Sequence, residues 1–180
     1  MILQIVKYGD PVLRQKGAAV GKVTAELKKL AQDMLDTMRE AEGVGLAAQQ
    51  IGRALQLAVI DIPADTKRPS RLWLDGKEAD VQSIMPLVLL NPQIEITKKK
   101  EIDNEGCLSF PGINIDVSRG FRVKVRYQDL ELQTREFEAA GLLGRAVQHE
   151  IDHLNGVLFI DKMSAADRRE LRDKIEALRG

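Results

Sequence analysis

The segment 141–155 constrains the fold more than any other part of the chain, because its pattern predicts a helix with almost no polar side. Apolar residues lie on nearly every face of this segment, namely Leu142, Leu143, Ala146, Val147, Ile151 and Leu154. Gly156 follows and is a typical helix stop. A helix that is apolar nearly all round is buried, so we expect the other elements to surround it. A chain of 180 residues is large enough for such a core, and we expect one domain over residues 1–180.

The rest of the pattern predicts strands in the middle of the chain and helices at both ends. Apolar segments, some of them alternating, predict strands at 55–62, 85–90, 93–97, 121–127 and 132–138. Thr24 is a candidate N-cap for a helix that extends to about Glu42 and stops at Gly43. Ser164 is a candidate N-cap for a last helix. Residues 64–83 are polar and rich in turn residues, so we expect a solvated surface insertion, as a hairpin or loop. The order of elements predicts an α+β fold.

The composition is that of a soluble globular protein without an electrostatic partner. Lys and Arg together number 27, as do Asp and Glu, so the net charge gives no reason to expect nucleic acid or an anionic membrane. The N-terminus lacks the pattern of a secretory signal, and no stretch has the apolar length of a membrane span. One cysteine cannot form an intramolecular disulfide, which fits a reducing compartment. We therefore expect a cytoplasmic protein.

The two histidines of the chain, His149 and His153, lie inside one H-E-x-x-H string on the predicted central helix. Residues four apart lie on the same face of a helix, so both imidazoles can bind one metal ion. Glu150 lies beside the first histidine, where its carboxylate can accept a proton from water activated by the metal. With a third protein ligand, one position stays open for water, as in catalytic metal sites. Such a site hydrolyses an amide or a similar acyl bond.

The third ligand is the open question of this predicted site. Cys107 is the only cysteine, and a thiolate is the strongest donor that the chain can offer. The backbone N–H of Leu108 comes directly after that ligand and is a candidate donor to the oxygen of the attacked carbonyl. Gln50, in a glycine-bounded loop, is a second candidate through its side-chain amide.

Three strings of this sequence, taken together, resemble the three motifs of the peptide deformylases. Residues 43–50 read G-V-G-L-A-A-Q-Q, residues 105–109 read E-G-C-L-S, and residues 148–156 read Q-H-E-I-D-H-L-N-G. They stand in the order in which the family has them. The resemblance implies an enzyme that removes the formyl group from nascent polypeptides beginning with formyl-methionine, at the ribosome. It also implies antiparallel sheets around the helix of the third motif.

The same resemblance implies roles for particular residues. Cys107, His149 and His153 would bind the metal, which in the family is typically Fe²⁺, with Zn²⁺, Ni²⁺ or Co²⁺ able to replace it. Glu150 would be the general acid and base. Gln50 and the amide of Leu108 would hold the developing oxyanion.

The resemblance also indicates where a substrate lies. The peptide would add as an extra strand beside the backbone of Val44, Gly45 and Gly106. Leu142 and Arg145 occupy positions that line the pocket for the methionine side chain. The family has an apolar residue at the position of Arg145, so this arginine either extends along the pocket rim or points to solvent. Three charged residues are candidates for the groups that orient the metal ligands, namely Glu105, Arg119 and Asp152.

Two alternatives remain open at this point. A zinc peptidase would take its third ligand downstream of the helix, and Glu170 and Glu176 are the candidates. A non-catalytic metal-binding or peptide-binding module would need neither Glu150 nor Gln50. We expect a monomer in either case.

Overall fold

The structure, a computed structural model, describes residues 1–180. Its helices are α1 (Ala25–Glu40), α2 (Gly141–Leu154) and α3 (Ala165–Ala177). Its strands are β1 (Gly45–Ala47), β2 (Leu57–Ile60), β3 (Ser70–Leu74), β4 (Lys77–Ala79), β5 (Leu87–Ile96), β6 (Lys100–Gly106), β7 (Asn114–Gly120), β8 (Arg122–Gln128) and β9 (Thr134–Ala140). Short 3₁₀ helices occupy Pro11–Arg14, Ala48–Ile51, Val81–Ile84 and Phe159–Lys162. None of the helices has the length and apolar character that a membrane crossing needs.

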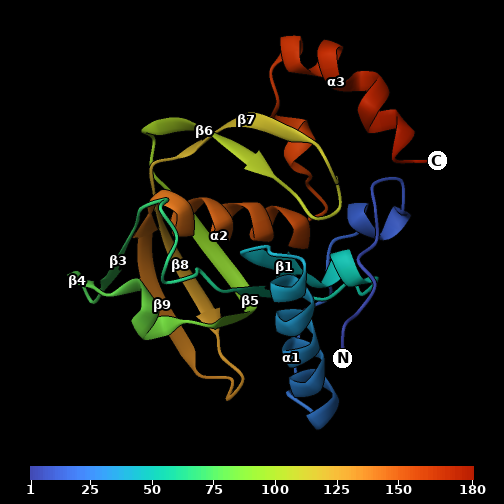
Figure 1. The fold of residues 1–180 in the computed structure, drawn as a ribbon. Coiled ribbons are helices and arrows are strands. Elements are labelled where there is room, and N and C mark those ends of the chain that lie inside the picture. The colour runs from blue at the N-terminus through green and yellow to red at the C-terminus, as the bar shows by residue number, and fades with distance from the viewer.

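Helix α2 lies between two antiparallel sheets, so the predicted α+β fold around a central helix is confirmed (Figure 1). The larger sheet has seven strands in the order β1-β2-β5-β8-β9-β3-β4, and the smaller consists of β6 and β7 alone. The main core forms where one face of α2 packs on the larger sheet, with Leu143 and Val147 fully buried against Leu89 and Val125. The helix therefore separates the two sheets and contacts both.

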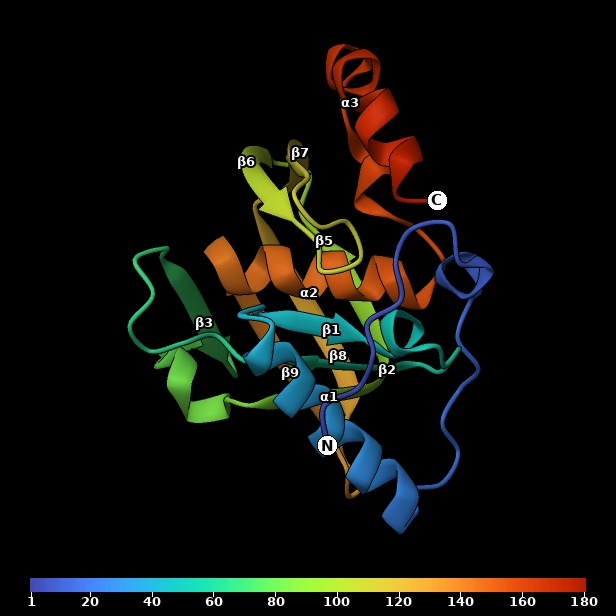
Figure 2. The same cartoon turned by 45° about the vertical axis from the view of Figure 1, so that its right-hand side comes forward.

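The two outer helices begin at the residues that local chemistry predicts. The hydroxyl of Thr24 accepts a hydrogen bond from the N–H of Leu27 at 3.1 Å, and Ser164 caps α3 in the same way. The end of α1 differs slightly from the prediction, because Glu42 rather than Gly43 has the left-handed backbone, with φ 59°. Figure 2 shows that α1 and α3 lie at opposite ends of the molecule.

The segment 64–83 forms the predicted hairpin, from strands β3 and β4, and is mostly exposed, but two of its residues are buried. Strand β3 also pairs with β9 and so extends the larger sheet. Leu72 on this strand is fully buried in the main core, and Trp73 is 8% exposed. The polar residues on both sides of this short apolar stretch concealed a strand that contributes to the core.

Two further differences concern strands. The predicted strands on either side of Asn91 are one strand, β5, with an irregularity between Leu90 and Gln93 where Asn91 takes φ 50°. The prediction also omitted β1, β6 and β7. Strand β6 is exposed at every position but one, so it has no alternation of apolar and polar residues that would indicate a strand.

Candidate metal centre

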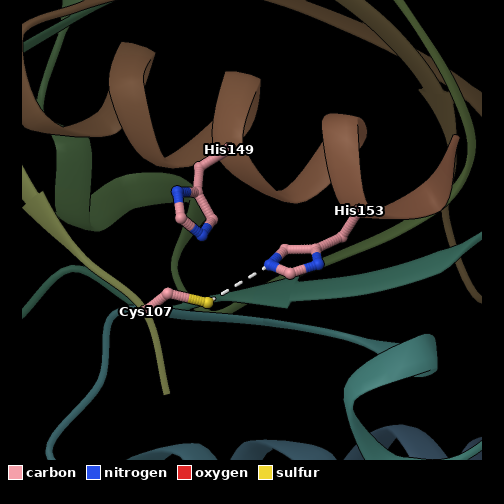
Figure 3. Close-up of side chains that lie close together, drawn as sticks. All are labelled: Cys107, His149 and His153. Carbon is pink, nitrogen blue, oxygen red and sulfur yellow. Dashed lines mark hydrogen bonds between the residues drawn. The ribbon is translucent and has the colours of Figure 1, made fainter. Parts of the chain in front are cut away.

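The structure brings Cys107, His149 and His153 together from two elements that are far apart in sequence. Both imidazoles project from α2 toward Cys107, which lies directly after the end of β6 (Figure 3). The three possible ligand atoms lie within 4.8 Å of one another, and Sγ of Cys107 is 3.4 Å from Nε2 of His153. No chelating residue from α3 joins them, since Glu170 and Glu176 are exposed on that helix. The third possible ligand beside the two histidines is therefore Cys107 and not a glutamate of α3.

The surroundings of the two histidines fit one divalent cation. Nδ1 of His149 is hydrogen-bonded to Oε1 of Glu105 at 3.0 Å, which leaves Nε2 free to act as a metal ligand. Nδ1 of His153 is buried without a hydrogen-bond partner. Burial lowers the pKa of His153 well below its ordinary value and so favours the neutral form that binds metals. One sulfur and two imidazole nitrogens suit Zn²⁺, Fe²⁺, Co²⁺ and Ni²⁺ better than the hard cations Mg²⁺ and Ca²⁺.

Glu150 lies beside the trio with a carboxylate that is almost fully buried. Its exposed fraction is 4%, and Oε1 has no hydrogen-bond partner in the protein. Burial raises the pKa of Glu150 to about 7, against the opposing effect of His149 and Arg119. Gly45 on β1 makes room for this carboxylate, since a Cβ there would lie 2.5 Å from Oε2 of Glu150. A proton acceptor with a pKa near neutrality therefore lines the same cavity as Cys107 and His149.

Gln50 is held with its amide nitrogen directed at the same place. Its Oε1 accepts a hydrogen bond from the N–H of Ala47 at 2.9 Å, which fixes the orientation of the amide group. Nε2 then donates to Oγ of Ser109 at 3.2 Å and lies 3.6 Å from Sγ of Cys107. Ser109 is fully buried and was not among the predicted site residues, although it closes the E-G-C-L-S string. Leu108 lies between Cys107 and Ser109 in the sequence, and its N–H makes no hydrogen bond to the backbone.

The three residues proposed to orient the ligands form one charge cluster with His149, in which only Asp152 is partly exposed. Arg119 on β7 donates to both oxygens of Glu105, through Nε at 2.6 Å and Nη2 at 2.9 Å. Its Nη1 donates to Asp152 on α2 at 2.9 Å. Burial by itself would raise the pKa of Glu105, but the hydrogen bonds from His149 and Arg119 outweigh it and lower the pKa to about 2. For His149, burial opposes the charged form, yet contacts with Cys107 and Glu105 raise its pKa well above the ordinary value.

Arg145 occupies one of the two positions predicted for it, since it lines the cavity over these groups and does not point to solvent. Only 6% of this residue is exposed, so it does not point to solvent. Its Nη1 donates to Oε2 of Glu105 at 2.8 Å and to the carbonyl oxygen of Val117 at 3.0 Å, and Nη2 donates to the carbonyl oxygen of Glu101. The prediction that it could point to solvent was wrong, and these hydrogen bonds were not predicted because their acceptors lie in β6 and β7, two strands that the prediction omitted.

A cavity of about 410 Å³ opens over these groups and is lined by all five residues that the resemblance assigned to substrate, Val44, Gly45, Gly106, Leu142 and Arg145. Further lining residues were not predicted, namely Arg68 from the loop before β3 and Phe110, Pro111, Ile113 and Asn114 from the segment after Cys107. The only signal in the sequence for Phe110, Pro111 and Ile113 is that they lie within four residues of the end of the second motif. For Arg68 the sequence contains no signal.

The C-terminal end of α2 is held by three donors. The carbonyl oxygen of Leu154 accepts hydrogen bonds from the N–H of Gly17 at 2.8 Å, from Nε2 of Gln56 at 2.9 Å and from Nε2 of Gln49 at 3.3 Å. Helix ends usually leave their last carbonyl groups to water. Here the donors come from two other segments, so the turn that carries His153 is fixed to the rest of the molecule.

A buried helix with two imidazoles and a carboxylate, opposite a cysteine and below a cavity, defines the class of metal-dependent hydrolases. Residues 2–169 match the sequence profile of the polypeptide deformylase family. A relative from Methylacidiphilum infernorum, named peptide deformylase, is 51% identical over 179 residues, which are 99% of this chain and 94% of that protein.

Solved structures agree with the sequence comparison. The crystal structure of a peptide deformylase from Thermotoga maritima has a TM-score of 0.77 and 38% identity, covering 91% of this chain and 99% of that one. A peptide deformylase from Synechococcus elongatus, solved in complex with actinonin, has a TM-score of 0.81 and 39% identity, covering 98% of this chain and 85% of that one. The chain therefore belongs to the polypeptide deformylase family, the metal-dependent hydrolases that deformylate nascent peptides.

Proposed function

We propose that this enzyme hydrolyses the N-terminal formyl group of polypeptides that begin with formyl-methionine, using one divalent ion bound by Cys107, His149 and His153. The observation that carries the proposal is the convergence of these three ligand atoms within 4.8 Å, beside the buried carboxylate of Glu150. Fe²⁺ is the ion that we propose for the native enzyme, and the donor set also suits Zn²⁺, Ni²⁺ and Co²⁺.

The role of Glu150 follows from its position and its pKa. When bound, the divalent ion supplies the Lewis acidity that makes water a nucleophile at neutral pH. Glu150, with a pKa of about 7, is suited to accept the proton of the attacking water. The same carboxyl group then returns that proton to the amine nitrogen of methionine as the C–N bond to the formyl group breaks. The products are formate and a peptide with a free amino group.

Two donors are available for the negative charge that develops on the formyl oxygen. Gln50 presents an amide N–H₂ whose orientation is fixed by the hydrogen bond from Ala47. The N–H of Leu108 has no backbone partner and follows directly after Cys107. Donors that are already oriented stabilise a transition state without further reorganisation.

The arrangement of strands supports binding of the peptide as an extended chain. Strand β1 is the first strand of the larger sheet and β6 pairs only with β7, so each has one unpaired edge. The cavity is lined by Val44 and Gly45 at the start of β1 and by Gly106 at the end of β6. A peptide can add to such an edge through its main-chain groups. Leu142 and Ala146, which also line the cavity, provide an apolar surface for the methionine side chain.

We further propose that residues 1–180 act as one catalytic domain and as a monomer, in the cytoplasm, on chains that emerge from the ribosome. The zinc peptidase alternative is less well supported, because its candidate ligands Glu170 and Glu176 are exposed on α3. A module that only binds metal or peptide does not need the buried carboxylate of Glu150 in the lining of this cavity.

The proposal is tested by measuring turnover of formyl-Met-Ala-Ser by enzyme prepared anaerobically with Fe²⁺, with acetyl-Met-Ala-Ser as the control substrate. We expect formate release from the formyl peptide alone. In Glu150→Ala, turnover should fall by about 100-fold or more while the metal content stays at one ion per chain. A folded, metal-loaded wild type that releases no formate would refute the proposed function.

A further inference from the structure

Arg145 joins the helix that carries the two histidines to both strands of the smaller sheet, the first of which leads into Cys107. It lies on α2, one turn before His149, and its guanidinium group extends across to the smaller sheet. There it contacts the carboxylate of Glu105 and the main-chain oxygens of Glu101 on β6 and Val117 on β7. Every one of these contacts connects the histidine helix to the sheet whose first strand leads into Cys107.

Hydrogen bonding to main-chain carbonyls distinguishes Arg145 from Arg119. Arg119 contacts only carboxylates, those of Glu105 and Asp152, so it orients side chains. Arg145 in addition contacts the backbone of both strands of the smaller sheet. A planar guanidinium group with five donors can hold several acceptors at fixed distances, which a lysine cannot.

We propose that Arg145 is a positioning residue of the metal centre, which fixes the distance between Cys107 and the two histidines. This inference rests on the proposed metal site and goes beyond the assignment of its ligands. The cysteine and the histidines belong to different elements, and the metal would find a preformed site only if the smaller sheet and α2 keep their spacing. Arg145 also shares Oε2 of Glu105 with Arg119, at 2.8 Å and 2.6 Å, and Glu105 holds the ring of His149.

Buried charge at this position needs a reason, because a buried guanidinium group is costly unless it is paired and its hydrogen bonds are satisfied. Leu142 and Ala146 on the same helix present apolar side chains to the cavity, and an apolar residue at 145 would avoid this cost. The hydrogen bonds from Arg145 to Glu105, Val117 and Glu101 satisfy the buried guanidinium group, and they connect α2 to the smaller sheet.

The experiment measures the affinity of the metal-free enzyme for Co²⁺, by competition with a chromophoric chelator, and the absorption spectrum of the Co²⁺ complex. We expect Arg145→Leu to lower the affinity about 10- to 100-fold, as is typical when a group that orients a ligand is removed. The thiolate-to-Co²⁺ absorption should weaken or shift. Arg126→Leu is the matched control, since Arg126 is exposed on β8 and its nearest ion-pair distance, to Glu136, is 3.8 Å. It should retain wild-type affinity and spectrum.

A thermodynamic cycle tests whether Arg145 acts through Glu105. If it does, the double variant Arg145→Leu with Glu105→Gln should lose less affinity than the sum of the two single losses. Arg145→Lys keeps the charge but cannot reach all the acceptors, and it should recover part of the affinity.

Two results would overturn the inference. One is a folded Arg145→Leu that binds Co²⁺ with the affinity and spectrum of the wild type. The other is failure of both Arg145→Leu and Arg145→Lys to fold, because Arg145 would then be required for the fold and not for ligand spacing. A wild type that binds no Co²⁺ through Cys107 would instead contradict the proposed metal site, so the two failures are distinguishable.

Discussion

At the scale of single residues, Gly45 is where the backbone of the larger sheet approaches the carboxylate of Glu150. A Cβ at this position would lie 2.5 Å from Oε2 and 2.9 Å from Cδ of a side chain that is 4% exposed, so the carboxylate would have to shift. We expect Gly45→Ala to lower kcat about 100-fold, because a displacement of about 1 Å in a catalytic group has effects of this size. Steady-state kinetics on the formyl peptide, with metal content measured alongside, provide the test.

Gly43→Ala is the matched control for this prediction. A Cβ at Gly43 would lie 2.8 Å from Cδ1 of Leu108, which is the end of a flexible side chain. The Cδ1 methyl group of Leu108 can rotate away from the added Cβ, so the loss in kcat should be much smaller than for Gly45→Ala. Equal losses in the two variants would mean that the approach to Glu150 is not what requires glycine at 45.

A second prediction at this scale compares the neighbouring residues Gln49 and Gln50. We expect Gln50→Leu to lower kcat about 100- to 1000-fold with a smaller change in KM, as when one donor to an oxyanion is removed. Gln49→Leu should leave kcat nearly unchanged, because its amide donates to the main-chain oxygens of Gln15 and Leu154 and not toward the cavity. Its effect should appear in the thermal unfolding midpoint instead. A loss of kcat in Gln49→Leu as large as that in Gln50→Leu would contradict the proposed role of Gln50.

At the scale of elements, the hairpin β3–β4 is a structural part of the larger sheet. Leu72→Ala removes a fully buried side chain from the main core, so we expect the free energy of unfolding to fall by about 2–5 kcal/mol. Lys77→Ala, on the exposed strand β4 of the same hairpin, should change it by less than about 0.5 kcal/mol. Urea denaturation measures the free energy of unfolding of both variants. A loss in Leu72→Ala as small as that in Lys77→Ala would mean that the hairpin is a solvated insertion without a structural role.

The elements also show what the sequence could and could not predict. Helix caps are local, so Thr24 and Ser164 indicated where α1 and α3 begin. The spacing of His149 and His153 likewise predicted that the two imidazoles share one face of α2. The contacts of Arg145 could not be predicted, because its acceptors are 28 to 44 positions away, in two strands that the prediction omitted. Strand β6 has no apolar alternation, and the alternation in β7 is limited to Ile115 and Val117. A guanidinium group beside two imidazoles could be placed correctly only after the smaller sheet was known.

At the scale of the whole molecule, an ion pair connects the N-terminal and C-terminal regions. Arg14 donates to both carboxylate oxygens of Asp161, at 2.6 Å and 3.1 Å. Burial would raise the pKa of Asp161, but the hydrogen bonds from Arg14 and from the N–H of Leu158 outweigh it and lower the pKa. A carboxyl group with a lowered pKa stabilises the fold above its ordinary pKa, and this contribution disappears as the pH falls through the lowered value.

We therefore expect Asp161→Asn to be less stable than the wild type at pH 7, by no more than about 1 kcal/mol because the pair is partly exposed. The difference should shrink as the pH falls below about 3.9, the ordinary value for aspartate, and vanish under more acidic conditions. Denaturant unfolding at a series of pH values measures it. A difference that grows toward acid pH would show that the pair does not stabilise the fold.

The three hydrogen bonds to the carbonyl oxygen of Leu154 affect the order in which the elements around the metal centre unfold locally. Helix ends normally open first, and their amide protons exchange with solvent sooner than those of the middle. In α2 the last turn should instead exchange as slowly as the interior, because Gly17, Gln49 and Gln56 must release it before it can unwind. Strand β6 is exposed and paired on one side only, so its amide protons should exchange first. The centre would then open from the side of Cys107, while the two imidazoles keep their places on the helix.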